Sequence, residues 1–181
     1  MFGQIKKEDS LLLVIDIQER LIPVIQEQKT LFNNVNKLIQ GIKIIGVPTL
    51  FTEQYSQGLG PTCKEIDRTE NTPIIEKISF SCMRSDEVKK RLNELKIRSI
   101  ILCGIETHIC VLQTALDALS QDYKVHVVAD AVSSRTDENK QLGLERMKQS
   151  GAFMVSTEMV LFQLLNRSGT EEFKGISKLI K

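Results

Sequence analysis

The chain has 181 residues and a mass of 20.5 kDa, a length typical of a single domain. Hydrophobic residues make up 41% and charged residues 26%, which excludes a mainly disordered chain. The 24 Lys and Arg residues nearly balance the 23 Asp and Glu residues, and this net charge of +1 argues against a nucleic acid as the main partner.

Six short apolar runs alternate with amphipathic stretches along the chain. Runs that are apolar on both faces and rich in β-branched residues are typical of a parallel sheet covered by helices. We therefore expect strands at residues 11–15, 47–51, 74–78, 99–103, 124–128 and 152–156.

Hydrophobic residues between these runs recur at the spacing of helices with one buried face. We expect helices at residues 31–44, 87–95, 110–119, 136–150 and 158–165, followed by a polar helix or tail. This alternation predicts one domain over residues 1–181, a three-layer α/β/α sandwich with a mainly parallel six-stranded sheet and right-handed crossovers.

One connection, residues 52–73, shows no periodic pattern over its length. Loops longer than about 12–15 residues in a compact domain are usually functional or disordered. Because this one contains Tyr55 and the Gly-Leu-Gly-Pro stretch at 58–61, we expect a shaped loop near a site.

The apolar runs are far shorter than the roughly 20 residues of a membrane-spanning helix, and residues 1–10 lack the features of a signal peptide. We therefore expect a cytoplasmic protein with no membrane partner. Its four cysteines, Cys63, Cys82, Cys103 and Cys110, have neither a Cys-x-x-Cys nor a zinc-type spacing, which predicts four separate thiols.

Ligands of open α/β sheets bind beyond the carboxyl ends of the strands, so the residues that follow each run are candidates. Asp16 follows the first run, Lys77 lies beside the third and Asp130 follows the fifth. The turn 104–110 follows the fourth run and brings Cys110 to the start of a helix.

Cys110, Asp16 and Lys77 together suit acyl transfer. A helix N-terminus and a nearby ammonium group both favour the thiolate form of a cysteine. Asp16 can orient Lys77, take the thiol proton and return it to a leaving group, while backbone N–H groups at the helix start stabilise an oxyanion.

Each of these residues also has a structural interpretation. An Asp after a first strand is often a cap or a buried acceptor, and a Lys in a weak strand is often solvated. His108 lies too close to Cys110 along the turn to present its ring to the sulfur, so we interpret it as a wall or structural residue. His126 and Cys103 lie within strand patterns and are interpreted as packed residues.

Three segments resemble the isochorismatase-like cysteine hydrolase family, which includes nicotinamidases and carbamoyl-sarcosine amidases. They are LLLVIDIQ at 11–18, EKISFS at 76–81 and GIETHICV at 104–111, in the family's order and spacing. The resemblance covers nearly the whole chain. Residues 52–60 and 156–162 are most similar to the isochorismatase-domain-containing subgroup.

The resemblance implies that Cys110 is the nucleophile, Asp16 the general base and acid, and Lys77 the positively charged partner. It also implies a non-proline cis peptide at Ile105–Glu106 and an oxyanion hole made by the backbone N–H groups of Glu106 and Cys110.

We expect Gln18, Gln54 and Phe80 to contact the substrate, with Tyr55 beside Gln54 in the wall of a small pocket. Nicotinamidases of the family carry an Asp-x-His metal site after the second strand. The matching residues here, 54–56, are Gln-Tyr-Ser, so we expect no metal and no cofactor.

The sequence thus predicts a metal-independent hydrolase that cleaves a non-peptide C–N bond in a small amide, or a related acyl compound, through a thioester. The resemblance also implies a homo-oligomer.

Two alternatives stay open. One is a hydrolase of an isochorismate-like vinyl ether, which Cys110 disfavours because such members typically lack this cysteine. The other is a catalytically silent binding or scaffold protein, which the intact Cys-Asp-Lys set disfavours.

Overall fold

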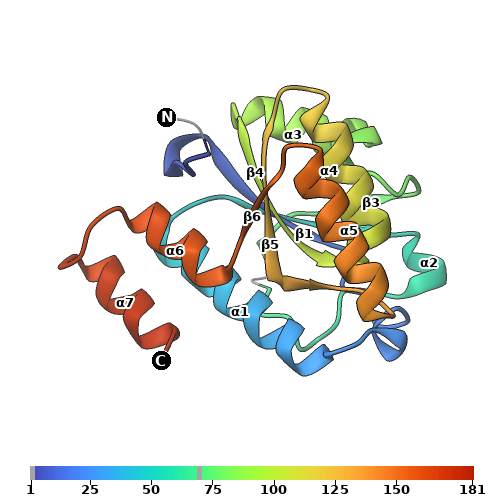
Figure 1. Ribbon diagram of the computed structural model, residues 1–181, viewed down its shortest axis with the longest axis horizontal. Helices are drawn as coiled ribbons and strands as arrows, with labels where there is room; N and C mark the ends of the chain where they lie inside the picture. The colour runs from blue at the N-terminus through green and yellow to red at the C-terminus, as the bar shows by residue number, and fades with distance from the viewer. Residues whose placement is uncertain (1–2, 69–70) are drawn as a thin grey trace.

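The computed structural model describes residues 3–68 and 71–181 and contains one six-stranded sheet between two layers of helices (Figure 1). The strands pair in the order β3-β2-β1-β4-β5-β6, and every pair is parallel. Their bounds are β1 (Ser10–Ile15), β2 (Thr49–Gln54), β3 (Ile74–Lys77), β4 (Ser99–Ile105), β5 (Lys124–Ser133) and β6 (Phe153–Val155).

Seven α-helices occur in the described part of the chain. They are α1 (Gln28–Ile45), α2 (Ser56–Leu59), α3 (Asp86–Glu94), α4 (Leu112–Leu119), α5 (Asp137–Gln149), α6 (Thr157–Leu165) and α7 (Glu171–Leu179). A π-helical turn, η4 (Thr107–Val111), precedes α4, and short 3-10 turns lie at Lys7–Asp9, Ile22–Val24 and Cys82–Arg84. The predicted three-layer α/β/α class is confirmed.

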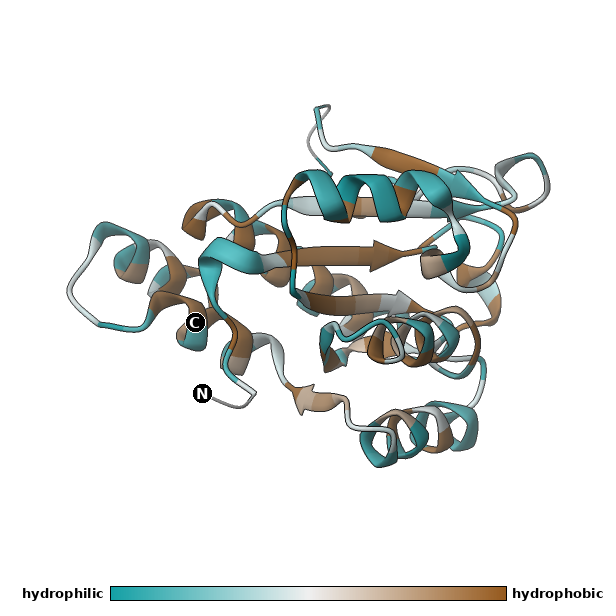
Figure 2. Cartoon of the chain, turned by 90° about the horizontal axis from the view of Figure 1, so that it is seen from above, coloured by the Kyte–Doolittle hydropathy of each residue, from teal (hydrophilic) through white to brown (hydrophobic). Residues whose placement is uncertain are grey.

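The two faces of the sheet carry separate hydrophobic cores. Helices α1, α6 and α7 cover one face, and α3, α4 and α5 cover the other (Figure 1). Every residue of β1 and β4 is buried, which explains why these strands are continuous apolar runs. Figure 2 shows the same arrangement, with hydrophobic strands inside and hydrophilic helix surfaces outside.

Several helices begin where a hydroxyl side chain caps free backbone N–H groups. The side chain of Ser85 accepts a hydrogen bond from the N–H of Val88 at the start of α3, and Thr136 accepts one from Asn139 at α5. Ser156 and Thr170 act in the same way at α6 and α7. These caps set the start of four of the helices that form the outer layers.

The strand order places a topological switch between β1 and β4. The chain proceeds from β1 outward to β2 and β3, then returns to β4 on the other side of β1. Gly104 allows the two strands to meet closely, because its φ is +115° and a Cβ there would lie 2.1 Å from the carbonyl oxygen of Ile15. The carboxyl ends of β1 and β4 therefore lie side by side, where this class of sheet binds ligands.

Several expected boundaries differ from the structure, and two of the differences concern candidate residues or the long connection. Strand β5 continues to Ser133, so Asp130 lies within the strand, where its carboxylate accepts hydrogen bonds from the N–H and hydroxyl of Thr157. Asp130 thus anchors the start of α6. The stretch 52–73, expected to be a shaped loop, contains the end of β2, helix α2 and a bridge between Gln18 and Thr62. Residues 69–70 lie outside the described part.

Candidate active site

A buried ion pair occupies the carboxyl end of the sheet. Asp16, directly after β1, is fully buried, and Lys77, the last residue of β3, is 4% exposed. The Lys77 Nζ lies 2.6 Å from the Asp16 Oδ2. Strand β2 lies between these two strands, so the lysine side chain crosses over it to reach the acid.

Lys77 donates to three acceptors. Besides Asp16, its Nζ donates to the Gln54 Oε1 at 2.8 Å and to the Ser79 carbonyl at 3.2 Å. Burial opposes its charge, but the nearby Cys82, Asp16 and Cys110 side chains outweigh burial and raise the pKa of Lys77. The side chain is therefore a fully hydrogen-bonded ammonium group.

Asp16 also accepts a hydrogen bond from Thr52, a residue of β2. The Thr52 hydroxyl donates to the Asp16 Oδ1 at 2.7 Å, and both residues are buried. Each carboxylate oxygen thus has its own donor. Asp16 itself adopts a left-handed backbone conformation, with φ of 51°, as the chain leaves the strand.

Cys110 lies in the π-helical turn η4 and is 7% exposed. Asp16 and Lys77 both lie close enough to its thiol to affect the thiol's pKa. Burial, and then the negative charge of Asp16, raise the pKa of Cys110 above its ordinary value, although Lys77 acts in the opposite direction. Desolvation and the charge of Asp16 thus favour the protonated thiol, against the effect of Lys77, which favours the thiolate.

The turn that carries Cys110 is held by contacts with its neighbours. The Ile105–Glu106 peptide bond, at the end of β4, is cis. The hydroxyl of Thr107 donates to the Ser133 carbonyl at 3.0 Å, and the His108 Nδ1 lies 3.0 Å from the Ser134 Oγ. His108 therefore has a structural contact, in agreement with its interpretation from the sequence.

Glu106 forms an ion pair with Arg135 at the start of the same turn. The Arg135 Nη2 and Nε lie 2.6 and 3.0 Å from the Glu106 carboxylate oxygens. Burial opposes the charge of Glu106, but the hydrogen bonds and charge of Arg135 lower its pKa. Arg135 is a contributor that sequence reasoning missed, because no local pattern links it to a residue 29 positions away.

The side chains of Gln18 and Gln54 form hydrogen bonds that join the segment after β1 to the ends of β2 and β3. Both N–H groups of the Gln18 amide are used, by the carbonyls of Gln54 and Gly60, and its Oε1 accepts from the Gln54 N–H at 2.7 Å. Gln18 thus has no free donor for a substrate. The Gln54 Nε2 donates to the Ile78 carbonyl at 2.6 Å, which leaves one of its N–H groups available.

Two aromatic residues expected near the pocket lie at the surface. Phe80 is 53% exposed and Tyr55 is 50% exposed. Both follow the carboxyl ends of their strands, at the edge of the sheet that carries Asp16 and Lys77. They stay candidates for contact with a substrate.

The residues that follow β2 do not suit a metal ion. The Gln54 oxygen already accepts from Lys77, and Tyr55 and Ser56 replace the hard and imidazole ligands of the nicotinamidase site. No group of three or more His, Cys, Asp or Glu side chains that could hold a metal occurs at 3–68 or 71–181.

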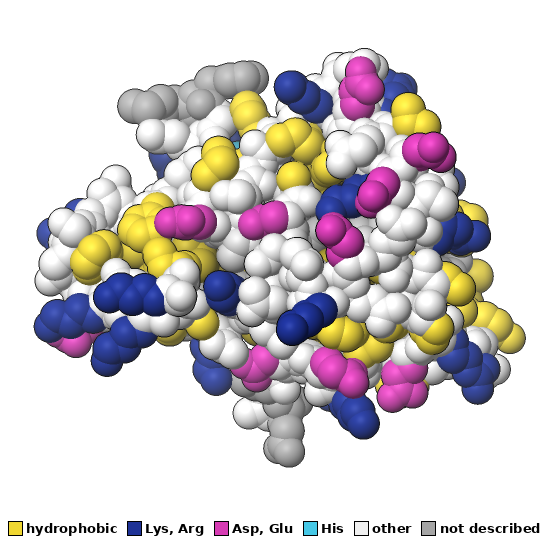
Figure 3. Space-filling model, turned by 60° about the horizontal axis from the view of Figure 1, so that its bottom comes forward, with side chains coloured by type: hydrophobic (Ala, Val, Ile, Leu, Met, Phe, Trp, Pro, Cys, Tyr) yellow, Lys and Arg dark blue, Asp and Glu magenta, His cyan; other side chains and the backbone are white. Residues whose placement is uncertain are grey.

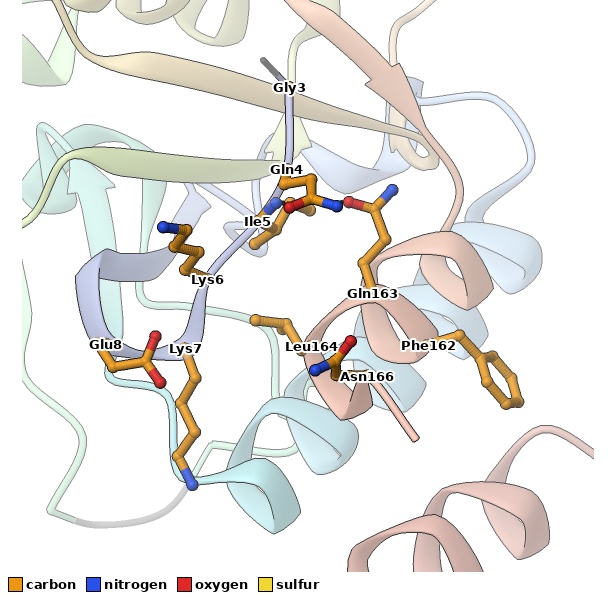
Figure 4. Close-up of a pocket in the computed structure, with 10 residues that line it drawn as sticks. All are labelled: Gly3, Gln4, Ile5, Lys6, Lys7, Glu8, Phe162, Gln163, Leu164 and Asn166. Atoms are coloured by element: carbon orange, nitrogen blue, oxygen red, sulfur yellow. Dashed lines mark hydrogen bonds between the residues drawn. The ribbon is translucent and has the colours of Figure 1, made fainter. Parts of the chain in front are cut away.

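A hollow of about 680 Å³ lies at the other end of the sheet (Figure 4). It is formed by the segment before β1 and by the last turn of α6, with Gln4, Lys7, Gln163 and Asn166 among its lining residues. No residue of the Asp16–Lys77–Cys110 group lines it. The cavity is therefore separate from the candidate active site.

A family model described as "Isochorismatase domain" matches residues 10–159. The secreted isochorismatase effector Isc1 of Phytophthora sojae is 44% identical, with 99% of this chain and 88% of the relative aligned. Isochorismatase domain-containing protein 2A of Mus musculus is 38% identical, with 99% and 86% aligned.

Solved structures have the same fold. The MAR1 ribonuclease of Caenorhabditis elegans has a TM-score of 0.92 and 37% identity, with 98% of this chain and 92% of that one aligned. The YcaC gene product of Escherichia coli, described as an octameric hydrolase of unknown specificity, has a TM-score of 0.93 at 24% identity over 99% of this chain and 90% of that one, a likeness of fold alone.

The all-parallel sheet and its strand order are those of the isochorismatase-like α/β hydrolase fold. The chain belongs to the isochorismatase family, as its sequence motifs predict.

Proposed function

We propose that the protein hydrolyses a small amide, or a related acyl compound, through a thioester on Cys110. The observation that carries this proposal is the buried Asp16–Lys77 ion pair, 2.6 Å long, whose two members both affect the pKa of the Cys110 thiol. A nucleophile, a base and a positive charge that lie together at one end of the sheet would suit acyl transfer, which supports the proposal.

In the first step the Cys110 sulfur attacks the carbonyl carbon of the substrate. Because its pKa is raised, the thiol gives its proton to Asp16 as the S–C bond forms. The electron pair of the carbonyl bond moves to oxygen, and the backbone N–H groups of Glu106 and Cys110 are our candidates to bind that oxyanion.

The intermediate then collapses. The C–N bond breaks, Asp16 returns its proton to the departing nitrogen and an amine or ammonia leaves. Water attacks the thioester with Asp16 as base, the C–S bond breaks, and the sulfur recovers the proton as the acid is released. Throughout, the ammonium of Lys77 stabilises the carboxylate and the negative charge that develops beside it.

The experiment is a hydrolysis assay on a panel of small amides with the wild type, Cys110→Ala and Cys63→Ala. Cys63 is also buried but lies in the loop before β3, so its replacement controls for loss of a thiol. We expect Cys110→Ala to lower kcat by about 10³-fold or more. Equal rates in the wild type and Cys110→Ala would contradict the proposal.

The same panel separates the alternatives. Hydrolysis of an isochorismate-like ether should survive Cys110→Ala, and a binding or scaffold protein should hydrolyse nothing. RNA is included because a relative is described as a ribonuclease. The face in Figure 3 shows acidic and basic side chains interspersed, and the net charge is +1, so we expect no RNA cleavage.

We further propose a cytoplasmic location. All four cysteines are free thiols, which suits a reducing compartment. Among the described residues no helix combines the length and the hydropathy needed to span a bilayer. The relative from Phytophthora sojae is described as secreted, so cell fractionation is the direct test.

A further inference from the structure

We propose that Thr52 and Cys82 form a hydrogen-bonded arm that holds the Asp16 carboxylate in the orientation that faces Cys110. The inference rests on the proposed function, for which it adds two positioning residues. Neither residue belongs to the Cys-Asp-Lys set, and both are buried.

The direction of the hydrogen bonds supports this role. The Thr52 hydroxyl gives its only proton to the Asp16 Oδ1, at 2.7 Å. The Cys82 sulfur lies 3.7 Å from the same hydroxyl oxygen, so the Cys82 thiol must be the donor in that contact. Burial raises the pKa of Cys82 to about 11, so it keeps the proton that it donates.

The arm also connects the acid to the helix that follows the nucleophile. The backbone N–H of Cys82 donates to the Thr114 Oγ1 at 2.9 Å, and Thr114 lies in α4, four residues after Cys110. A movement of α4 would therefore be transmitted to Cys82 and, through Thr52, to Asp16.

The arm and Lys77 donate hydrogen bonds to different oxygens of the Asp16 carboxylate. Thr52 donates to Oδ1 and Lys77 donates to Oδ2, so the plane of the carboxylate cannot rotate without losing a hydrogen bond. Without the Thr52 hydroxyl, Oδ1 would be a buried charged acceptor with one donor fewer. We expect the carboxylate to turn toward Lys77 and away from the Cys110 thiol.

The test compares Thr52→Val, which removes the hydroxyl at nearly constant shape, with Thr52→Ser, which retains it. We measure kcat and KM on an amide from the panel, and the rate at which iodoacetamide alkylates Cys110, followed by peptide mass spectrometry. For Thr52→Val we expect kcat to fall about 10- to 100-fold with KM within about twofold. Alkylation of Cys110 should become several-fold faster, because the Asp16 charge that raises the pKa of Cys110 moves away and more of the thiolate forms. Thr52→Ser should restore both rates to within about threefold of the wild type.

Cys82 is tested in the same way, with Cys103→Ala as the matched control. Both cysteines are fully buried thiols, but Cys103 lies within β4 on the opposite face of the sheet. Cys82→Ala should lower kcat about threefold, and it should cause no further loss when Thr52→Val is already present, because the arm is then broken. Cys103→Ala should leave kcat unchanged.

Unchanged kcat and alkylation in Thr52→Val would overturn the proposal. Equal losses in Thr52→Val and Thr52→Ser would overturn it too, because packing and not the hydroxyl would then explain the effect. If the wild type hydrolyses none of the amides, the proposed function fails. The alkylation rates of Cys110 then still decide whether the arm controls the thiol.

Discussion

Lys77 is stable as a buried cation because every one of its protons has an acceptor. An isolated ammonium group in this interior would lose its charge or unfold the site, but the carboxylate of Asp16 and two neutral oxygens replace the lost water. The same arrangement leaves Asp16 dependent on Lys77. Removal of either partner therefore exposes the other to the full cost of burial.

We expect Lys77→Met to lower the free energy of unfolding by about 3–5 kcal/mol, because it leaves the Asp16 carboxylate buried without its cation. Urea unfolding measures this. The control is Lys174→Met, which breaks an ion pair with Glu171 that is also 2.6 Å long but lies at the surface. The free energy of unfolding of Lys174→Met should differ from that of the wild type by close to zero. Similar losses in both variants would show that burial is not the cause.

Strand β5 carries a buried histidine that has no role in the proposed chemistry. His126 is fully buried and stacks on Phe153 of β6, with ring centroids 5.0 Å apart. Neither of its ring nitrogens has a partner among the described residues. Burial, with a smaller effect of Lys124, lowers the pKa of His126 to about 4, so the folded strand holds a neutral ring.

The buried His126 should lower the free energy of unfolding in acid. The unfolded chain binds a proton at His126 near pH 6.5, whereas the folded chain does so only near pH 4. The stability that the neutral His126 permits is therefore fully present above pH 6.5. It is lost as the pH falls from 6.5 toward 4, because the unfolded chain then binds a proton that the folded chain does not. At pH 5 we expect a loss of about 2 kcal/mol relative to pH 7. His126→Phe should remove this part of the pH dependence in urea unfolding. An identical pH dependence in both proteins would contradict the assignment.

On the scale of the whole molecule, one group of exposed apolar side chains lies at the carboxyl end of the sheet. Tyr55, Ile78 and Phe80 are 50%, 71% and 53% exposed, and all three lie where β2 and β3 end. Exposed apolar groups that gather at one place commonly mark a contact with a ligand or another chain. They agree with the homo-oligomer that the family resemblance implies.

We expect the protein to sediment at a multiple of its 20.5 kDa chain mass. The double variant Ile78→Asp and Phe80→Asp should reduce the assembly, because it places charges in an apolar contact. Leu142→Asp is the control, since Leu142 is 64% exposed on α5. A wild-type protein that sediments at 20.5 kDa at every concentration would contradict this expectation.

Much of the architecture follows from local patterns. Strands such as β1 and β4 are buried on both faces and are therefore continuous apolar runs, and the amphipathic stretches between strands contain the helices of the outer layers. Asp16 and Cys110 could be found as candidates because they follow such runs. Polar groups at the ends of buried strands commonly form a cap or a functional site.

Contacts between distant segments account for the rest. The raised pKa of Cys110 follows from its burial and from Asp16, which lies 94 positions earlier in the sequence, and no helix-start pattern indicates that burial. The amide N–H groups of Gln18 donate to the carbonyls of Gln54 and Gly60, and Thr52 of the neighbouring strand β2 donates to Asp16. A linear pattern shows which residues are apolar and how they repeat. Charge states and hydrogen-bond partners depend on which groups the folded chain brings together after water is removed.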